Sequence, residues 1–240
     1  SPITDTLETN YMPYAMSVIV SRALPEIDGF KPAHRKLLYT MYGMGLLKGV
    51  RTKSANIVGS TMHLNPHGDA AIYDTMVRMG RSNESLLVPF VDSKGNFGKA
   101  YSRDMAYAAA RYTEAKLEPV CEELFRDIDK DTVDFVDNYD STMKEPTLLP
   151  AAFPSVLVNA NTGIAVGMAS SICPFNLAEV CTTAAELSTA RRWSRSTKQA
   201  AAASRCARAI RMINPQTASI LPRSRRRRPL KPLWKRSSTL

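Results

Sequence analysis

Residues 54–79 read SANIVGSTMHLNPHGDAAIYDTMVRM, and this stretch decides the fold. Ser54 is a plausible N-cap for a helix with apolar residues along one side, and Asn65-Pro66-His67-Gly68 breaks that helix. Asp69 is a plausible cap for a further helix, on which apolar residues recur at i, i+4 and i+7. Two helices joined by a tight turn predict a helix-turn-helix, whose second helix enters the major groove of DNA.

The flanking segments predict the elements around this motif. Pro32 stands where a first helical turn tolerates proline, and residues 32–44 have the apolar spacing of an amphipathic helix. Residues 86–91, a glycine-rich turn and a further extended piece indicate a β-hairpin, which after a helix-turn-helix forms a wing. Residues 103–118 are predicted as a helix carrying Tyr112. A charged helix through Asp131 and a strand at 133–137 complete an α+β fold.

Charge is distributed unevenly along the 240 residues, whose formal net charge is +10. Residues 190–240 hold 15 of the 32 Lys and Arg and no acid, so residues 1–189 carry 17 bases against 22 acids. A phosphate-binding surface outside the tail must therefore be local. Neither a membrane span nor a secretory signal is visible, and four scattered cysteines suggest a reducing compartment, so we expect a cytoplasmic protein.

The candidate chemistry centres on Tyr112, which follows Arg111 directly. A tyrosine that attacks a phosphodiester needs a proton acceptor and cations on the phosphate oxygens. His67 lies in a turn from which it could reach a phosphate or a phenol. Further candidates for contacts with DNA phosphates are Arg22, Lys31, His34, Arg35 and Lys36, which form a basic cluster around the first helix, and Lys53 and Ser54, which stand at a helix start.

Each candidate also has a structural interpretation. Tyr112 could be a half-buried aromatic residue, His67 could stabilise a turn, and Arg35-Lys36 could form a solvated helix face. Their order along the chain decides between these interpretations. Residues 1 to about 187 resemble the N-terminal part of the A subunit of bacterial type IIA DNA topoisomerases, gyrase A or topoisomerase IV A. The resemblance rests on YAMSVIV (14–20), RALP (22–25), DGFKP (28–32) with HRK (34–36), KSA (53–55), PHGD (66–69), GNFG (95–98), RYTE (111–114), VDFVDNYD (133–140) and GIAVGMA (163–169).

The resemblance implies a role for each residue. Tyr112 would form a 5′-phosphotyrosyl link, Arg111 would stabilise the phosphate, and Arg22 and His67 would assist. Ile164 would wedge between base pairs and bend the DNA, and the helix from Asp69 would lie against the groove. Mg²⁺ and ATP would be bound mainly by a partner B subunit, in an A2B2 complex with an A-subunit homodimer. Double-stranded DNA would be the substrate, in the bacterial cytoplasm at the nucleoid.

The sequence departs from the family pattern at two positions of the motif around His67. Asn65 replaces the usual first histidine, and Ala70 stands where relatives usually have the serine associated with quinolone binding. Asp74 retains the acid of that drug site. We therefore expect weakened quinolone binding.

The predicted domains are an N-terminal arm (1–20), a winged-helix DNA-cleavage domain (21–140), the start of a truncated tower domain (141–187) and a basic tail (188–240). The tail is rich in Arg, Ala, Ser and Pro, and we expect it to be disordered. Two origins are open, a reading-frame shift near residues 187–190 or a genuine DNA-binding arm. Truncation would impair dimerisation and strand passage. The alternative functions are a non-catalytic winged-helix DNA-binding protein and a fragment that only binds the B subunit through residues near 1–20.

Overall fold

The structure is a computed structural model that describes residues 2–101 and 106–193, with the backbone alone for 188–193. It contains helices and antiparallel strands, which confirms the α+β prediction. The chain divides into two units, residues 1–183 and 184–240. In the described ranges, no helix combines the length and the apolar character needed to cross a membrane.

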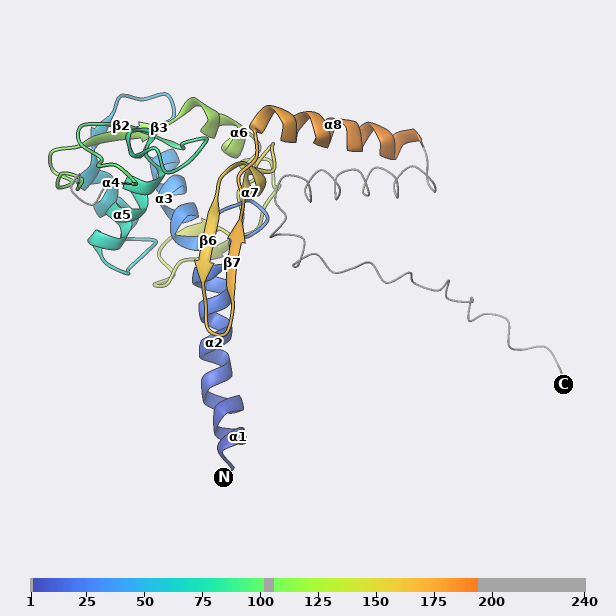
Figure 1. The fold of residues 1–240 in the computed structure, drawn as a ribbon. Helices are drawn as coiled ribbons and strands as arrows, with labels where there is room; N and C mark the ends of the chain where they lie inside the picture. Colours follow the sequence, from blue (N-terminus) through green and yellow to red (C-terminus); the bar gives the residue numbers. More distant parts are fainter. Residues whose placement is uncertain (1, 102–105, 194–240) are drawn as a thin grey trace. The chain divides into compact units, whose positions relative to one another are not determined.

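The helical arm is a continuous run of helix that ends at Ala23, three residues beyond the predicted boundary of the N-terminal arm at residue 20 (Figure 1). It comprises α1 (Ile3–Thr6), η1 (Leu7–Tyr11), α2 (Met12–Val18) and η2 (Ile19–Ala23), of which η1 and η2 are π-helical. Pro13 lacks a backbone N–H and stands just after η1, where the regular α-helical bonding is interrupted. The side chains of the arm are largely exposed, and its buried residues are Ala15 and Ala23.

Three helices supply 10 of the 22 residues in the buried hydrophobic cluster. They are α3 (Pro32–Gly43), α4 (Ser54–Thr61) and α5 (Asp69–Met79). Most of their predicted apolar positions lie in or against this cluster, but Met62, which was also predicted on the apolar side and follows α4 directly, is exposed. Pro32 occupies the first turn of α3, as predicted. The predicted caps are wrong: Lys53 and Gly68 occupy the N-cap positions, and neither helix has a side-chain cap bond. Ser54 is instead fully buried, and the Asp69 carboxylate accepts a hydrogen bond only from the next residue.

A three-stranded antiparallel sheet packs beside these helices. Its order is β1 (Thr52–Lys53), β3 (Glu114–Leu117) and β2 (Val91–Lys94). Ala115 and Leu117 alternate with partly exposed residues, which is the period of a strand with one buried face. The helix predicted over residues 103–118 is therefore wrong in its described part. The strand predicted at 86–91 is wrong except at Val91, because β2 spans Val91–Lys94, and the partner strand of β2 begins only at Glu114.

Smaller elements follow. They are η3 (Arg81–Asn83), η4 (Pro119–Cys121), α6 (Glu122–Phe125), β4 (Phe135–Asp137) paired with β5 (Lys144–Pro146), α7 (Ser155–Val158), β6 (Asn161–Ile164) paired with β7 (Ala169–Ile172), and α8 (Leu177–Trp193). The charged helix predicted through Asp131 ends at Phe125, whereas the strand predicted at 133–137 is confirmed over 135–137 by β4. Because α8 continues to Trp193, residues 188–193 are helical and not disordered as predicted. The rest of the predicted tail lies outside the described residues.

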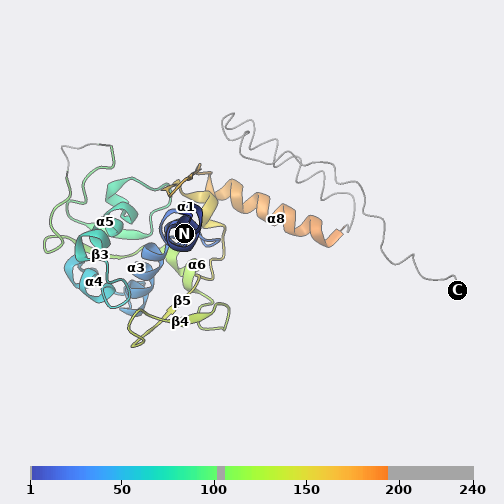
Figure 2. The ribbon, with the colours of Figure 1, turned by 90° about the horizontal axis from the view of Figure 1, so that it is seen from below.

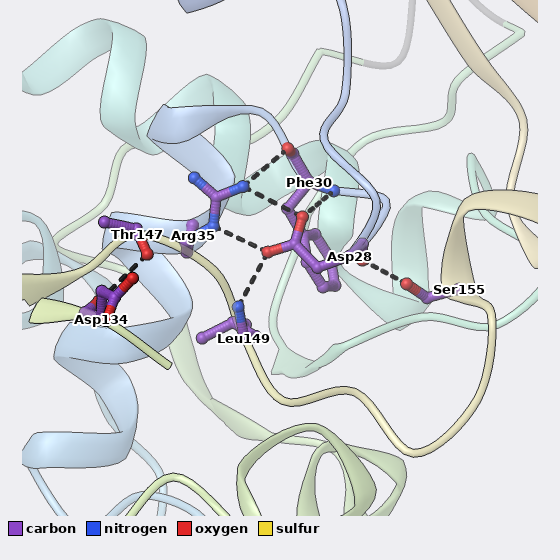
Figure 3. Close-up of polar contacts among 7 residues, drawn as sticks. All are labelled: Asp28, Phe30, Arg35, Asp134, Thr147, Leu149 and Ser155. Atoms are coloured by element: carbon purple, nitrogen blue, oxygen red, sulfur yellow. Dashed lines mark hydrogen bonds and ion pairs between the residues drawn. The ribbon is translucent and has the colours of Figure 1, made fainter. Parts of the chain in front are cut away.

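Asp28 joins distant parts of the chain to the start of α3 (Figure 3). Its carboxylate accepts hydrogen bonds from Arg35 Nε at 2.7 Å and Arg35 Nη2 at 3.0 Å, and from the backbone N–H groups of Phe30 and Leu149, both at 3.0 Å. The hydroxyl of Ser155 donates to the Asp28 carbonyl. Gly29 follows with a φ of +78°, and a Cβ there would meet Val156 N at 2.6 Å. Glycine is therefore required where this turn meets α7.

Candidate functional site

Tyr112 lies in a turn immediately before β3, with 66% of its surface exposed. Its backbone N–H bonds to the carbonyl of Ala109 at 2.9 Å, which closes the turn. The guanidinium carbon of Arg111 lies 4.6 Å from the centroid of the Tyr112 ring. In a helix these neighbours would point about 100° apart. The turn places them together, so that one group in solvent can meet both the phenol and a cation.

The residue after Tyr112 attaches this turn to the interior of the protein. Thr113 is completely buried; its hydroxyl donates to Ser54 Oγ at 2.8 Å and lies 2.9 Å from the hydroxyl of Tyr73. The Tyr73 hydroxyl also donates to the carbonyl of Ala108 at 2.7 Å. Backbone bonds from Ser54 N–H to Thr113 O (3.0 Å) and from Ala55 N–H to Ala110 O (3.2 Å) complete the attachment. The start of α4 and the first half of α5 thus fix the backbone that presents Tyr112.

Glu114 extends this arrangement to two lysines on neighbouring strands. Lys53 Nζ lies 2.9 Å from one carboxylate oxygen, and Lys94 Nζ lies 3.7 Å from the other. The hydrogen bond from Lys53 lowers the pKa of the Glu114 carboxyl, and the charges of both lysines act in the same direction. Lys53, predicted as a DNA contact, is exposed but already paired. Ser54 is not an open phosphate seat, because its hydroxyl is buried against Thr113.

A second group of bases lies at the start of α3. Burial, together with the nearby charges of Lys31, Arg78 and Arg35, lowers the pKa of His34 to about 4, so this imidazole is neutral at pH 7. Burial and the charge of Arg78 also lower the pKa of Lys31, whose Nζ donates to the carbonyl of Thr162 at 2.8 Å. Burial is the larger cause of both shifts, and the neighbouring positive charges, which an anion such as a phosphate would offset, add to it. Arg78 is exposed at the last turn of α5 and is not among the residues predicted from the sequence.

Two predicted DNA contacts, Arg35 and Lys36, already have partners within the protein. Arg35 is buried and forms the two-pronged ion pair with Asp28, so its expected place in an exposed basic cluster is corrected. Lys36 is partly buried, donates to the carbonyl of Leu64 at 2.8 Å and lies 3.1 Å from a carboxylate oxygen of Glu145. Its cation is largely neutralised. Local sequence could not reveal either pairing, because turns bring the acids from outside α3.

The remaining predicted residues are distributed over separate elements. Arg22 is exposed at the end of η2, and His67 is exposed in the turn before α5. No hydrogen bond or ion pair within the described residues joins either one to Tyr112. Asp69 and Ala70 are exposed at the start of α5, and Asp74 accepts a hydrogen bond from the Tyr107 hydroxyl. Ile164 ends β6 with 87% of its surface exposed.

No three His, Cys, Asp or Glu side chains of residues 2–101 and 106–187 lie close enough to hold one metal ion. Two carboxylates of these elements already have partners, Glu114 two lysines and Asp74 the hydroxyl of Tyr107. These side chains therefore do not fit a magnesium site of their own. The roles of Tyr73 and Thr113 in holding the turn were not predicted from the sequence. For Thr113 a signal was present, because residues 113–117 alternate with the period of a strand.

The sequence of the chain is similar to those of known proteins over most of its length. Residues 22–194 match the model of a family described as the A subunit of DNA gyrase/topoisomerase IV. The DNA gyrase A subunit of Borreliella burgdorferi is 50% identical over 182 residues, which cover 75% of this chain and 22% of the relative. The corresponding gyrase protein of Streptomyces coelicolor is 53% identical over 178 residues (72% and 20%), and that of Helicobacter pylori J99 is 51% identical over 181 residues (74% and 22%). The chain thus spans about a fifth of the length of these relatives.

Proposed function

The chain belongs to the family of DNA gyrase and topoisomerase IV A subunits, and on that premise we propose that residues 21–140 act as the DNA-cleavage domain of a type IIA DNA topoisomerase. In this proposal α4, the turn containing His67 and α5 form the helix-turn-helix, and the β1-β3-β2 sheet forms the wing. The observation that carries the proposal is the exposed Tyr112 with the Arg111 guanidinium against its ring, on a turn anchored through Thr113. An exposed phenol on an anchored backbone suits a nucleophile.

The proposed reaction is a transesterification. The phenol oxygen of Tyr112 bonds to the phosphorus of a DNA phosphodiester, and the bond from that phosphorus to the 3′-oxygen breaks. The phenol loses one proton and the 3′-oxygen gains one, so no net oxidation or hydrolysis occurs. The product is a 5′-phosphotyrosyl link, and attack by the 3′-hydroxyl reverses the step. Arg111 supplies positive charge to the phosphate, and the exposed Arg22 and His67 approach it from the arm and from the turn before α5.

DNA would be held by several further groups. Lys31 and Arg78 carry positive charge close to the neutral imidazole of His34, and these two cations suit a backbone phosphate. The start of α5, at Asp69, would lie against the groove. Ile164, at the exposed end of β6, would insert between base pairs and bend the duplex.

The proposal includes a partner. We expect a B subunit to hold most of the Mg²⁺, which supplies charge stabilisation at the phosphate, and to bind ATP. The complex would be of the A2B2 type, located at the nucleoid in the bacterial cytoplasm. The chain itself binds, orients and attacks the DNA. Tower residues (141–187) would begin the region that continues in the longer relatives.

Drug sensitivity follows from residues at the start of α5. Ala70 offers no hydroxyl, and the Asp74 carboxylate already accepts a hydrogen bond from Tyr107. We expect a quinolone to trap little cleaved DNA with this chain. Ala70→Ser should increase drug-stabilised cleavage, and full quinolone sensitivity of the unaltered chain would contradict the assignment.

The direct test mixes the full chain with a gyrase or topoisomerase IV B subunit, Mg²⁺ and supercoiled plasmid, and traps the reaction with detergent. A covalent protein–DNA adduct is expected, and Tyr112→Phe should abolish it. Tyr139→Phe is the matched control, because Tyr139 is also an exposed tyrosine but lies beyond β4. DNA binding without an adduct would favour the non-catalytic alternative, and B-subunit binding alone would favour an interaction fragment.

A further inference from the structure

The β6-β7 hairpin, which carries Ile164, has little structural support of its own. It is a separate two-stranded sheet, and an isolated pair of strands is marginally stable in water. Seven of its eight strand residues are exposed or partly exposed, and the buried residue is Gly163. The orientation of the hairpin, and with it that of Ile164, must therefore depend on what Gly163 contacts.

Gly163 packs against the last residue of the helical arm. A Cβ added at Gly163 would stand 1.9 Å from the carbonyl oxygen of Ala23, 2.7 Å from its carbonyl carbon and 3.0 Å from Ser170 Oγ. Only a residue without a side chain permits this approach of two backbones. Ala23 is buried, and Figure 1 shows the hairpin beside the arm. Figure 2 looks nearly along the axis of the arm, and the gold β6-β7 hairpin lies next to it in this view as well.

A second attachment holds the preceding residue. Lys31 Nζ donates to the carbonyl of Thr162 at 2.8 Å, from the residue that caps α3. Two successive residues of β6 are thus held by different parts of the chain, and Ile164 comes directly after them. On the other side of the contact, Ala23 adjoins the exposed Arg22. The contact consequently fixes the distance between a candidate phosphate ligand and a candidate wedge.

We propose that Gly163 is a positioning residue that locks the wedge hairpin onto the arm, so that Ile164 kinks DNA at a fixed distance from Arg22. This inference rests on the proposed DNA-bending role of Ile164. A methyl group at Gly163 would displace the hairpin by an ångström or more, since van der Waals contact needs at least about 3 Å. The Ile164 side chain would then be unchanged, but it would no longer be aligned with the base step that it enters while Arg22 contacts the phosphate.

The test uses the full chain carrying Tyr112→Phe, so that binding and bending are measured without cleavage. Two duplexes of about 30 bp are compared, one intact and one with a central nick that makes bending easy. Fluorescence energy transfer between labelled DNA ends reports the bend, and titration reports affinity. Gly163→Ala is expected to bend the intact duplex less and to bind it about tenfold more weakly, whereas its affinity for the nicked duplex should fall less than about twofold.

Three further variants separate the outcomes. Gly59→Ala is the matched control, because a Cβ there would meet no atom within 4 Å beyond its chain neighbours and the backbone of α4, and it should behave as the parent. If Gly163→Ala does not fold by circular dichroism, Lys31→Met replaces it. Loss of the proposed contact between Lys31 and a DNA phosphate should lower the affinity for both duplexes equally. Any additional loss of affinity for the intact duplex therefore reports the missing hydrogen bond from Lys31 to Thr162. An equal loss on both duplexes, or normal bending by Gly163→Ala, overturns the inference. If Ile164→Ala bends DNA normally, the proposed wedge itself is wrong, and this inference is wrong with it.

Discussion

Replacing Asp28 with alanine tests the main polar attachment of the fold. The substitution removes the acceptor for both Arg35 bonds and for the N–H groups of Phe30 and Leu149. Arg35 would then be a buried cation without a partner, since 6% of its surface is exposed. Breaking a buried ion pair by removing one member costs about 3–5 kcal/mol. Natural domains have only about 5–15 kcal/mol of stability, so the loss is large.

The assay is urea unfolding of the full chain followed by far-UV circular dichroism, with thermal melting in parallel. For a chain of this length, about 3–5 kcal/mol corresponds to a fall in Tm of roughly 6–20 °C. The double variant Asp28→Ala with Arg35→Met should recover about 2 kcal/mol relative to the sum of the single variants, because no buried charge remains. A loss below about 1 kcal/mol for Asp28→Ala, or strict additivity in the double variant, would refute this reasoning.

Three further predictions concern the candidate site. Thr113→Val should lower the free energy of unfolding by about 1–3 kcal/mol and reduce adduct formation, whereas Thr75→Val, which loses only a bond within α5, should do neither. Because the pKa of His34 is lowered to about 4 in the folded state, its contribution to stability is complete above pH 6.5 and is lost as the pH falls from 6.5 towards 4; NMR titration should give this pKa, and His34→Gln should remove that part of the pH dependence. Arg78→Gln should weaken DNA binding uniformly across sequences and reduce the salt slope by about one, while Arg81→Gln, already paired with Glu118, should leave the slope unchanged.

The sequence was sufficient for elements whose apolar spacing is regular. Helices α3 and α5 begin and end close to the predicted residues, because their buried faces repeat at helical spacing. The segment before β3 was mispredicted as a helix because its alanines favour that state. Its conformation depends instead on hydrogen bonds of Thr113 to Ser54 and Tyr73, which are distant in sequence.

The candidate site was predictable in its motifs but not in its pairings. Tyr112 and Ile164 are exposed, which the pattern of residues could only suggest. The burial of Arg35 depends on a turn that folds Asp28 back onto α3, and no local pattern distinguishes this arginine from a surface one. Arg78 was missed for the converse reason, since its nearness to Lys31 and His34 is a tertiary fact.

The measurement that tests the central proposal most directly is the chemical identity of the protein–DNA link. The full chain is reacted with a B subunit, Mg²⁺ and plasmid, trapped with detergent, digested with nuclease and protease, and analysed by mass spectrometry. The proposal requires a nucleotide joined through its 5′-phosphate to the phenol oxygen in the peptide containing Tyr112. An unmodified Tyr112 peptide beside a modified peptide elsewhere, or no modified peptide at all, would contradict it.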